Sequence, residues 1–303
     1  MSEPSPQPSS VHVPVLLDEI IQWLRPSEGA ILVDGTLGGG GHARALARLV
    51  GPKGLIVALD RDGQAIERAE RELADEPIRP IGANYCNLPE VLQALEIESV
   101  DGIVLDLGLS SDQLADPSRG FSFSLGGPLD LRFDTTRGEP AARLVNRLSA
   151  EHLADIIYEY GEERFSRRIA RAIIERRREQ PIETAEELAE LVRRCVPAFG
   201  GRSRGRSRID PATRTFQALR IAVNEELRSL EIALKRLPDC LKPDGRIAII
   251  SFHSLEDRRV KNAFRDDERL ESLTKKPIVP GPEEEARNPR SRSAKLRVAR
   301  RVY

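Results

Sequence analysis

The chain has 303 residues, of which 31% are charged and 4% aromatic, and its formal net charge is -1. This length can bury a sizeable core, so we expect one large domain and a smaller one. The balanced charge excludes a protein that binds nucleic acid over its whole surface and leaves only local basic patches for that purpose. The three cysteines and four histidines are scattered, which excludes a disulfide framework and predicts no metal site.

No segment of the sequence is typical of a membrane protein or an exported one. No apolar run approaches the length of a membrane span, and residues 1–10 lack the basic start and apolar centre of a signal peptide. We therefore expect a cytoplasmic protein without a membrane partner. Residues 1–10 are expected to be disordered. The sequence leaves the oligomeric state open.

A glycine-rich turn lies between two apolar runs, each of which ends in an acid. The first run covers residues 31–34 and ends at Asp34, and five glycines follow within seven residues. A helix is expected from His42 to Val50, and the second run ends at Asp60. This order predicts half of a nucleotide-binding βαβ unit, with free backbone N–H groups at the start of the helix.

The alternation of helices and apolar runs continues along the chain. Helices over residues 62–74 and 88–95 precede an apolar run that ends at Asp106, and a last run over residues 246–252 follows the turn Lys242-Pro-Asp-Gly245. Continuous apolar runs between helices are typical of parallel strands that are buried on both faces. The predicted fold is therefore α/β, with a Rossmann-like, doubly wound sheet.

An insertion interrupts this alternation. About 140 residues separate Asp106 from Arg246, whereas a βαβ crossover needs only roughly a few tens. We predict an all-α domain at residues 115–209, inserted into a discontinuous core of residues 11–114 and 210–303, to which a helix over 213–237 returns the chain. One helix of the insertion is introduced by a capping box, Thr184-Ala-Glu-Glu187. The helices expected in the insertion cover residues 141–148, 152–160, 162–178 and 185–195.

The ligand of the glycine turn can be narrowed by charge. The spacing Gly38-x-Gly40-x-x-Ala43 fits a loose dinucleotide fingerprint, which would favour a nicotinamide or flavin cofactor. Asp34 would repel a pyrophosphate, whereas S-adenosylmethionine has no phosphate and carries a cationic sulfonium and ammonium. The acid beside the glycines therefore favours S-adenosyl-L-methionine, and a glycine turn without any ligand is the remaining alternative.

Further polar or aromatic residues follow the predicted strands. Asp60 could accept hydrogen bonds from both ribose hydroxyls, Tyr85 could stack on adenine, and Asp106 could bind the adenine amino group or the methionine ammonium. For each residue alone, a capping or packing role is an equal alternative. Ligands of open parallel sheets bind beyond the carboxyl ends of the strands, where four residues are expected to meet: Asp34, Asp60, Tyr85 and Asp106.

Nine motifs, spread over nearly the whole chain, carry a resemblance to one family of enzymes. They include Asp34-Gly-Thr-Leu-Gly-Gly-Gly-Gly-His42, Gly127-Pro-Leu-Asp-Leu-Arg132 and Ser251-Phe-His-Ser-Leu-Glu-Asp-Arg258. In these motifs the chain is similar to the ribosomal RNA small-subunit methyltransferase H family. The other six are His12-Val-Pro-Val-Leu-Leu-Asp-Glu19, Asp106-Leu-Gly-Leu-Ser-Ser111, Arg119-Gly-Phe-Ser-Phe123, Tyr160-Gly-Glu-Glu-Arg164, Ala212-Thr-Arg-Thr-Phe-Gln-Ala-Leu-Arg220 and Asn288-Pro-Arg-Ser-Arg-Ser-Ala-Lys295.

The resemblance implies an S-adenosylmethionine-dependent methyltransferase core with an inserted helical domain. It also implies the reaction, which is methylation of N4 of a decoding-centre cytosine in 16S rRNA, with the small ribosomal subunit as partner. The family often has an aromatic residue where Leu37 stands and Phe where Tyr85 stands, and both departures are mild. The cofactor contacts implied by position are Gly40, Gly41, His42, Asp60, Tyr85, Asp106 and Gln113.

The reaction needs an aligned base and a proton acceptor, because the lone pair of an exocyclic cytosine amine is delocalised into the ring. The polar loop after the Asp106 strand lacks the Asn-Pro-Pro-aromatic or Asp-Pro-Pro-aromatic tetrapeptide of many amino-group methyltransferases, so it does not identify the acceptor. We predict catalytic roles for Ser251 and His253, and stacking of Phe252 on a base that has left its stack. Asp130 and Arg132 are expected to cover the pocket. For His253 a structural hydrogen bond is an equal alternative.

Two clusters of basic side chains are predicted to contact the phosphates of the rRNA. The alternatives are a solvated loop for the first and a disordered tail for the second. The run Arg176-Arg-Arg178 is interpreted as a solvated helix end. The first cluster comprises Arg202, Arg204, Arg206, Arg208 and Arg214, and the second comprises Arg287, Arg290, Arg292, Lys295, Arg297, Arg300 and Arg301.

Two other functions remain open at this point. A nicotinamide-dependent oxidoreductase is favoured only by the glycine spacing and Asp60. A non-catalytic assembly factor of the small subunit could retain the same fold, although an intact glycine turn and the strand-end acids argue against it.

Overall fold

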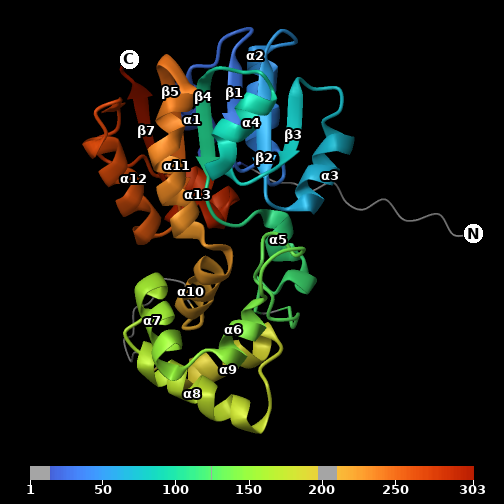
Figure 1. Ribbon diagram of the computed structural model, residues 1–303, viewed down its shortest axis with the longest axis vertical. Coiled ribbons are helices and arrows are strands. Elements are labelled where there is room, and N and C mark those ends of the chain that lie inside the picture. Colours follow the sequence, from blue (N-terminus) through green and yellow to red (C-terminus); the bar gives the residue numbers. More distant parts are fainter. Residues whose placement is uncertain (1–13, 124, 197–209) are drawn as a thin grey trace, which may run out of the picture. The chain divides into compact units, whose positions relative to one another are not determined.

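The computed structural model describes residues 14–123, 125–196 and 210–303, and the chain forms two compact units. The first unit comprises the chain up to Asp112 together with Arg228–Tyr303, and the second comprises Gln113–Leu227 (Figure 1). Residues 1–10, for which we predict disorder, lie outside the described residues.

The first unit is built on a seven-stranded sheet in the order β3-β2-β1-β4-β5-β7-β6 (Figure 1). The five strands from β3 to β5 are parallel, and β7 runs antiparallel to both β5 and β6. This sheet confirms the α/β, Rossmann-like prediction. Its strands are β1 (Ile31–Asp34), β2 (Leu55–Asp60), β3 (Ile78–Gly82), β4 (Val100–Asp106), β5 (Leu241–Ser251), β6 (Leu270–Ser272) and β7 (Lys295–Arg301).

Alternate residues of the strands face two separate hydrophobic cores. On one face Val33, Leu59 and Leu105 pack with α4, α11 and α12, and on the other face the neighbouring strand residues pack with α1, α2 and α3. The sheet is thus buried on both faces, which explains its continuous apolar runs. The helices of this unit are α1 (Leu17–Leu24), α2 (Gly41–Val50), α3 (Gly63–Glu72), η1 (Tyr85–Asn87), α4 (Leu88–Ala94), α11 (Glu226–Cys240), which begins at the boundary, α12 (Ser254–Asp266), α13 (Pro282–Arg287) and η3 (Pro289–Ser293).

The strand register places the predicted acids at one edge. Asp34 pairs with Ala58 of β2 and Val104 of β4, so the ends of three strands lie together. Asp60 and Asp106 follow at the last positions of their own strands. The predicted turn at residues 242–245 is a bulge inside β5, because its pairing with β4 shifts between residues 100 and 102 and Asp244 has a φ of 65°.

The C-terminal basic segment is part of the sheet. We considered a disordered tail for this segment, but residues 295–301 form β7, whose Ala299 and Val298 pair with β5. Both residues are buried. Because Val298 and Ala299 are consecutive, the segment lacks the strict alternation of apolar and polar residues that predicts a half-buried strand.

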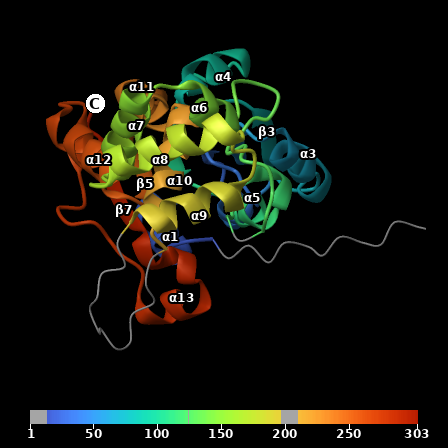
Figure 2. The ribbon, with the colours of Figure 1, turned by 90° about the horizontal axis from the view of Figure 1, so that it is seen from below.

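The second unit is helical, and α7 packs against both α8 and α10 (Figures 1 and 2). Its core includes Ile157 of α7, Ile169 and Ile173 of α8, and Val192 of α9, all fully buried. The predicted capping box at Thr184 is present, with Glu187 as its partner. The helices are α5 (Ser111–Ala115), which spans the boundary, η2 (Pro117–Arg119), α6 (Ala141–Arg147), α7 (Ala150–Gly161), α8 (Ser166–Glu179), α9 (Ala185–Cys195) and α10 (Thr213–Asn224).

The structure differs from the prediction at the end of this unit. The helix expected over residues 213–237 is interrupted at Glu225, whose φ is 50°, and forms α10 and α11. Because α10 packs on α7, through contacts such as the hydrogen bond from Gln217 to the Tyr160 carbonyl at 2.9 Å, the unit extends to Leu227. The predicted domain limits of 115–209 are therefore replaced by 113–227.

Candidate active site

Asp60 links the end of β2 to the glycine turn. Its Oδ2 accepts a hydrogen bond from the Gly38 N–H at 2.8 Å, and its Oδ1 accepts one from the Asp62 N–H at 2.8 Å. These bonds orient the carboxylate, and each oxygen keeps a further lone pair for two neighbouring hydroxyls. Burial raises the pKa of Asp60 to about 6 despite the two backbone hydrogen bonds.

Asp34 is buried, and only one of its two carboxylate oxygens has a hydrogen-bond partner among the described residues. The side chain is 1% exposed, and its Oδ1 accepts a hydrogen bond from the Thr36 N–H at 3.1 Å. Its Oδ2 is buried and has no hydrogen-bond partner among the described residues. Burial raises the pKa of this carboxyl above its ordinary value.

Asp106 resembles Asp34 in this respect. Its Oδ1 is buried without a hydrogen-bond partner in the described parts of the chain, and its Oδ2 lies 3.8 Å from His42 Nδ1. Burial raises the pKa of Asp106 to about 6, with partial opposition from His42. The Asp106 N–H donates to Thr36 Oγ1 at 2.6 Å, which ties the glycine turn to β4. Sequence reasoning did not single out Thr36, a residue that the glycines overshadow.

His42 makes its contacts within the protein. The ring is 4% exposed, and its Nε2 lies 2.9 Å from the carbonyl oxygen of Val15, to which it donates. The other nitrogen faces Asp106. A direct cofactor contact of His42 therefore stays a prediction.

The glycines of the turn serve two purposes. Gly38 and Gly40 have φ values of 49° and 75°, a left-handed conformation that other residues rarely adopt. Gly35 and Gly41 allow close packing instead, since a Cβ on Gly35 would lie 2.3 Å from Leu105 Cδ2. A Cβ there would also lie 3.1 Å from Cβ of Tyr85, which places the base of that side chain beside the turn.

These features decide the kind of ligand that the edge can hold. The charge of Asp34 raises the pKa of both Asp60 and Asp106, so the three carboxyls repel one another when ionised. A cationic ligand would relieve this repulsion and supply donors to the two unpartnered oxygens, whereas a pyrophosphate would add to it. The residues therefore fit a ligand with ammonium and sulfonium groups and a ribose.

Comparison with known proteins now identifies the family. The model of the MraW methylase family matches residues 9–302. This chain belongs to that family. It is 52% identical over 302 residues to a ribosomal RNA small subunit methyltransferase H of Rhodopirellula baltica, a match that covers 96% of this chain and 91% of the relative.

Further relatives with the same name are of similar length. The protein of Deinococcus radiodurans is 49% identical, and the match covers 99% of this chain and 93% of the relative. The protein of Thermomicrobium roseum is 48% identical, with 97% and 94% covered. Membership of a methylase family confirms the predicted family and enzyme class, and it removes the support for a nicotinamide-dependent oxidoreductase.

The loop after β4 is held by an arginine of the C-terminal basic cluster. Arg290 donates to the carbonyl of Leu109 and, at 2.5 Å, to Ser111 Oγ. Asp112 in turn forms an ion pair with Arg68 of α3. Gln113, a predicted cofactor contact, is buried in α5 as the first residue of the second unit, and its role stays a prediction.

The residues predicted to act in catalysis lie where β5 ends. Phe252 packs against the loop after β4, since its Cδ2 lies 3.4 Å from the position of a Cβ on Gly108. Ser251 is 1% exposed and donates to the carbonyl of Lys295 in β7 at 3.3 Å, which is a structural contact. His253 Nε2 lies 3.2 Å from Oε1 of Glu256, a residue that sequence reasoning did not single out.

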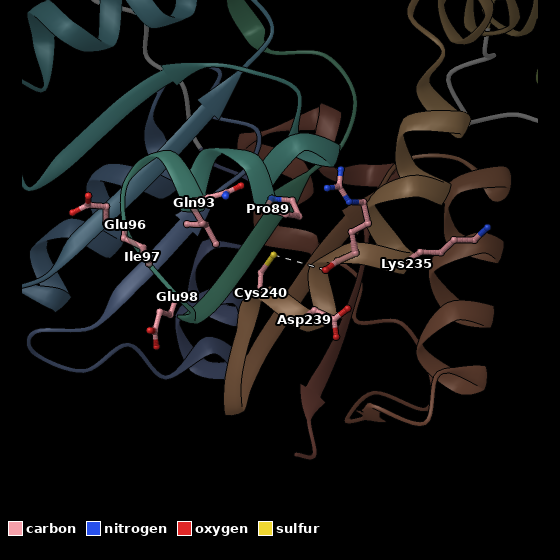
Figure 3. A pocket seen from close by; sticks show the side chains of 10 residues that line it. Pro89, Gln93, Glu96, Ile97, Glu98, Lys235, Asp239 and Cys240 are labelled. Atoms are coloured by element: carbon pink, nitrogen blue, oxygen red, sulfur yellow. Dashed lines mark hydrogen bonds between the residues drawn. The ribbon is translucent and has the colours of Figure 1, made fainter.

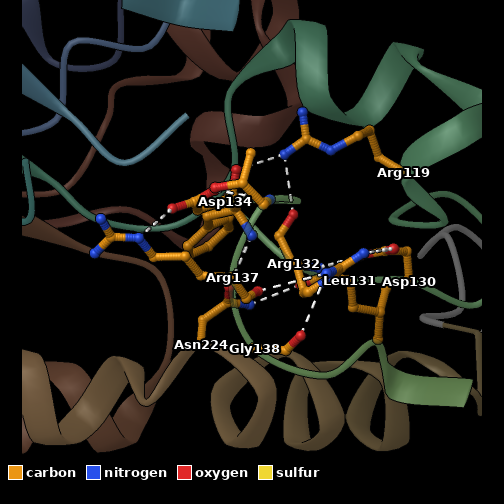
Figure 4. Close-up of polar contacts among 10 residues, drawn as sticks. Arg119, Asp130, Leu131, Arg132, Asp134, Arg137, Gly138 and Asn224 are labelled. Carbon is orange, nitrogen blue, oxygen red and sulfur yellow. Dashed lines mark hydrogen bonds and ion pairs between the residues drawn. The ribbon is translucent and has the colours of Figure 1, made fainter. Parts of the chain in front are cut away.

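Asp130 and Arg132 belong to a clamped loop in the second unit (Figure 4). Arg132 donates to Asp130 through Nε at 2.9 Å and through Nη2 at 2.7 Å. Arg119 is 3% exposed and donates to the carbonyls of Arg132 and Phe133. These contacts shape the loop, so the predicted role of Asp130 and Arg132 toward the substrate stays a prediction.

The predicted basic clusters are only partly available to RNA. In the first cluster only Arg214 lies within the described residues, and it forms a 3.9 Å ion pair with Glu163. In the second cluster Arg297 is buried in a 2.6 Å ion pair with Asp257, and Arg300 pairs with Glu271 and Asp244. Ion pairs within the protein thus use three of the seven side chains of the second cluster, Lys295, Arg297 and Arg300, and for the others the contact with phosphates stays a prediction.

A separate cavity lies between α4 and α11 (Figure 3). Its volume is about 660 Å³, and its lining includes Ile97, Glu98 and Cys240, which precede the amino ends of β4 and β5. The cavity is thus at the sheet edge opposite the three acids. Burial raises the pKa of Cys240 to about 11, so the thiol there is protonated and unreactive at neutral pH.

Among the residues that the structure describes, none of the helices is long and apolar enough to cross a membrane. No group of three or more His, Cys, Asp or Glu side chains in the described ranges could hold a metal ion.

Proposed function

We propose that this protein transfers the methyl group of S-adenosyl-L-methionine to 16S rRNA of the small ribosomal subunit, at the exocyclic N4 amine of a cytosine. The observation that carries the cofactor assignment is the convergence of Asp34, Asp60 and Asp106 on the glycine turn, with two buried oxygens that have no hydrogen-bond partner among the described residues. Full-length relatives at about 50% identity, named for small-subunit rRNA, support the substrate.

Different residues of the first unit are proposed to bind different parts of the cofactor. Asp60 has the two free lone pairs that a ribose diol requires, and Tyr85 stands beside the turn, where an adenine could stack on it. The unpartnered oxygens of Asp34 and Asp106 would receive the cationic methionine end. Bound S-adenosylmethionine supplies an electrophilic methyl group on its sulfonium.

The end of β5 is suited to hold the acceptor base. Asp106 pairs with Ile250, so the β5 residues that follow lie beside the loop after β4. Phe252 presents an aromatic ring there for stacking, and His253 provides a nitrogen that could accept the amine proton. Ser251, whose hydroxyl is engaged within the sheet, is left out of this proposal.

RNA phosphates have another basic surface available, on α8. Arg167, Arg168 and Arg171 are exposed, and none of them forms an ion pair with an acid of the described residues. Other arginines of this helix have structural contacts: Arg177 donates to the carbonyls of Val145 and Leu148 at the end of α6. We therefore place phosphate contacts at the three unpaired arginines.

Methyl transfer to isolated ribosomal particles tests this function. Small subunits from cells that lack the protein are incubated with the enzyme and labelled S-adenosylmethionine, and rRNA fragments are analysed by mass spectrometry. We expect one added methyl group on the N4 of a cytosine in 16S rRNA, and no transfer by Asp106→Ala. Binding to the particle without any transfer would instead support the assembly-factor alternative.

A further inference from the structure

Glu256 is a buried acid held against His253. It lies in the first turn of α12 and is 3% exposed. Its Oε2 accepts a hydrogen bond from the Phe252 N–H at 2.9 Å, and its Oε1 lies 3.2 Å from His253 Nε2. The carboxylate is thereby oriented toward one nitrogen of the imidazole, and because the His253 side chain is only 9% exposed, water screens this interaction little.

The other nitrogen of the ring lacks a partner of this kind. His253 Nδ1 is buried and has no hydrogen-bond partner among the described residues. An unpartnered buried polar atom costs about 1–3 kcal/mol, so its presence points to a group that arrives from outside the chain. The ring follows Phe252, which packs on Gly108, two residues beyond Asp106. His253 is therefore at the sheet edge where we place the reacting groups.

We propose that Glu256 is a positioning residue that keeps the proton of His253 on Nε2, so that Nδ1 is the proton acceptor for the substrate amine. This inference rests on the proposed function. The bond that forms joins the amine nitrogen to the methyl carbon, and the bond that breaks leaves its electron pair on sulfur. The amine proton passes to Nδ1, and the carboxylate of Glu256 stabilises the resulting imidazolium.

The contact between Glu256 and His253 Nε2 can become a well-aligned hydrogen bond during the reaction. It is short, but its alignment in this structure does not make it a hydrogen bond. Contacts of catalytic histidines are often loose without substrate and tighten in the substrate complex. A small rotation of the ring, driven by an amine at Nδ1, would align the Nε2 proton with Oε1.

Glu256→Gln tests the role of the carboxylate with little change of shape. The amide oxygen can still accept from the Phe252 N–H, which turns the amide NH₂ toward Nε2 and favours the proton on Nδ1. We expect kcat to fall on the order of 100-fold or more, with the KM for S-adenosylmethionine changed less than about twofold. Wild-type kcat in this variant would overturn the proposal.

Asp257→Asn is the matched control. Asp257 follows Glu256 on the same helix and forms a part-buried ion pair, 2.6 Å from Arg297. This variant loses an ion pair from the same turn of the helix and is expected to keep kcat. If Asp257→Asn lowered kcat as much as Glu256→Gln, Glu256 would have only a structural role.

A double variant and a spectroscopic measurement separate the remaining outcomes. If the two residues act as a unit, His253→Gln combined with Glu256→Gln is no slower than His253→Gln alone, whereas multiplied losses contradict the proposal.

Nitrogen NMR of the labelled histidines is expected to show the Nε2–H form of His253 in the wild type and a shift toward Nδ1–H in Glu256→Gln. An Nδ1–H form in the wild type would overturn the inference even if Glu256→Gln did not fold. If the wild type transferred no methyl group to small subunits, the proposed function would fail, and the NMR result would still decide how Glu256 acts on the ring.

Discussion

Two regions of the molecule contain buried or partly buried carboxylates, and the regions differ in whether these carboxylates are paired. At the sheet edge of the first unit, Asp34 and Asp106 each keep a buried oxygen without a partner in the described residues. In the second unit, both oxygens of Asp130 accept hydrogen bonds from Arg132. An unpaired buried charge costs stability unless a ligand pairs it, whereas a paired charge can shape the backbone around it. The difference separates a site for a ligand from a device that holds a loop.

The loop in the second unit has a reason to be held. Leu131 has a φ of 64°, a conformation that costs a residue other than glycine roughly 1–2 kcal/mol. Asn224 donates to the Leu131 carbonyl at 2.7 Å and accepts from the Phe133 N–H at 2.7 Å. Together with Arg119 and the pair of Asp130 with Arg132, these bonds offset the strain (Figure 4).

The largest effect is expected from the removal of the carboxylate that links turn and ligand. Asp60→Ala loses the bond to Gly38 and the predicted bonds to the ribose. Charged hydrogen bonds contribute about 1.5–3 kcal/mol each, so the loss of two of them should lower the affinity for S-adenosylmethionine by at least about 100-fold in calorimetry. Unchanged affinity would remove Asp60 from the site.

Asp130→Asn should act in the opposite way, on stability and not on the cofactor. It replaces the acceptor pair of Arg132 and weakens the clamp of the strained loop. We expect the free energy of unfolding to fall by about 2 kcal/mol in denaturant titration while S-adenosylmethionine binds as before. Glu139→Gln is the control, because this exposed partner of Arg143 and Arg147 should contribute little. A loss of cofactor affinity in Asp130→Asn would contradict the division between the two regions.

The stability of the protein and its affinity for S-adenosylmethionine should both depend on pH, because of the acids at the sheet edge. Burial raises the pKa of Asp60 and Asp106 to about 6, so both are ionised only above that pH. Their contribution to the stability of the unliganded protein is present below about pH 4 and is lost as the pH rises through 6, since the folded state holds these protons more tightly. A cationic ligand prefers the ionised form, so its affinity should rise on the order of tenfold from pH 5.5 to 7.5. A flat profile in calorimetry would contradict the pairing of the ligand with these acids.

The smallest effect is expected on α8 of the second unit. Substitution of Arg167, Arg168 and Arg171 by Gln should weaken binding of small-subunit rRNA and reduce the slope of log affinity against log salt by about 2. The control is Arg143→Gln with Arg147→Gln, which removes arginines that already pair with Glu139. An equal slope for both variants would place the phosphate contacts elsewhere.

The first region could be predicted from the sequence because its signals are local. The apolar runs that end at Asp34, Asp60 and Asp106 each form one buried strand, and the glycines follow directly. The parallel arrangement of those strands then brings the acids together. Glu256 had a local signal as well, since it is the third residue of a helix whose N-cap is His253, a position from which a Glu side chain commonly reaches back toward the cap.

Other features depend on contacts that are distant in sequence. The basic C-terminal segment forms β7 because β5 pairs with it and because Asp257 and Glu271 neutralise its arginines. The break at Glu225 lacks a glycine or proline, and Arg220 pairs with the adjacent Glu226 at 2.8 Å to hold it. Neither the pairing nor the break has a short-range pattern that would predict it.

The substitution Asp34→Asn tests most directly whether the unpaired acids form a cofactor site. The amide of Asn can still accept the hydrogen bond from the Thr36 N–H. It carries no charge, so its burial lacks the desolvation penalty of the Asp34 carboxylate. Measured side by side, the thermal stability of the unliganded variant should exceed that of the wild type, while its affinity for S-adenosylmethionine should fall at least about tenfold. A variant that is less stable and binds S-adenosylmethionine as tightly as the wild type would show that Asp34 is a structural acid and contradict the assignment of this edge.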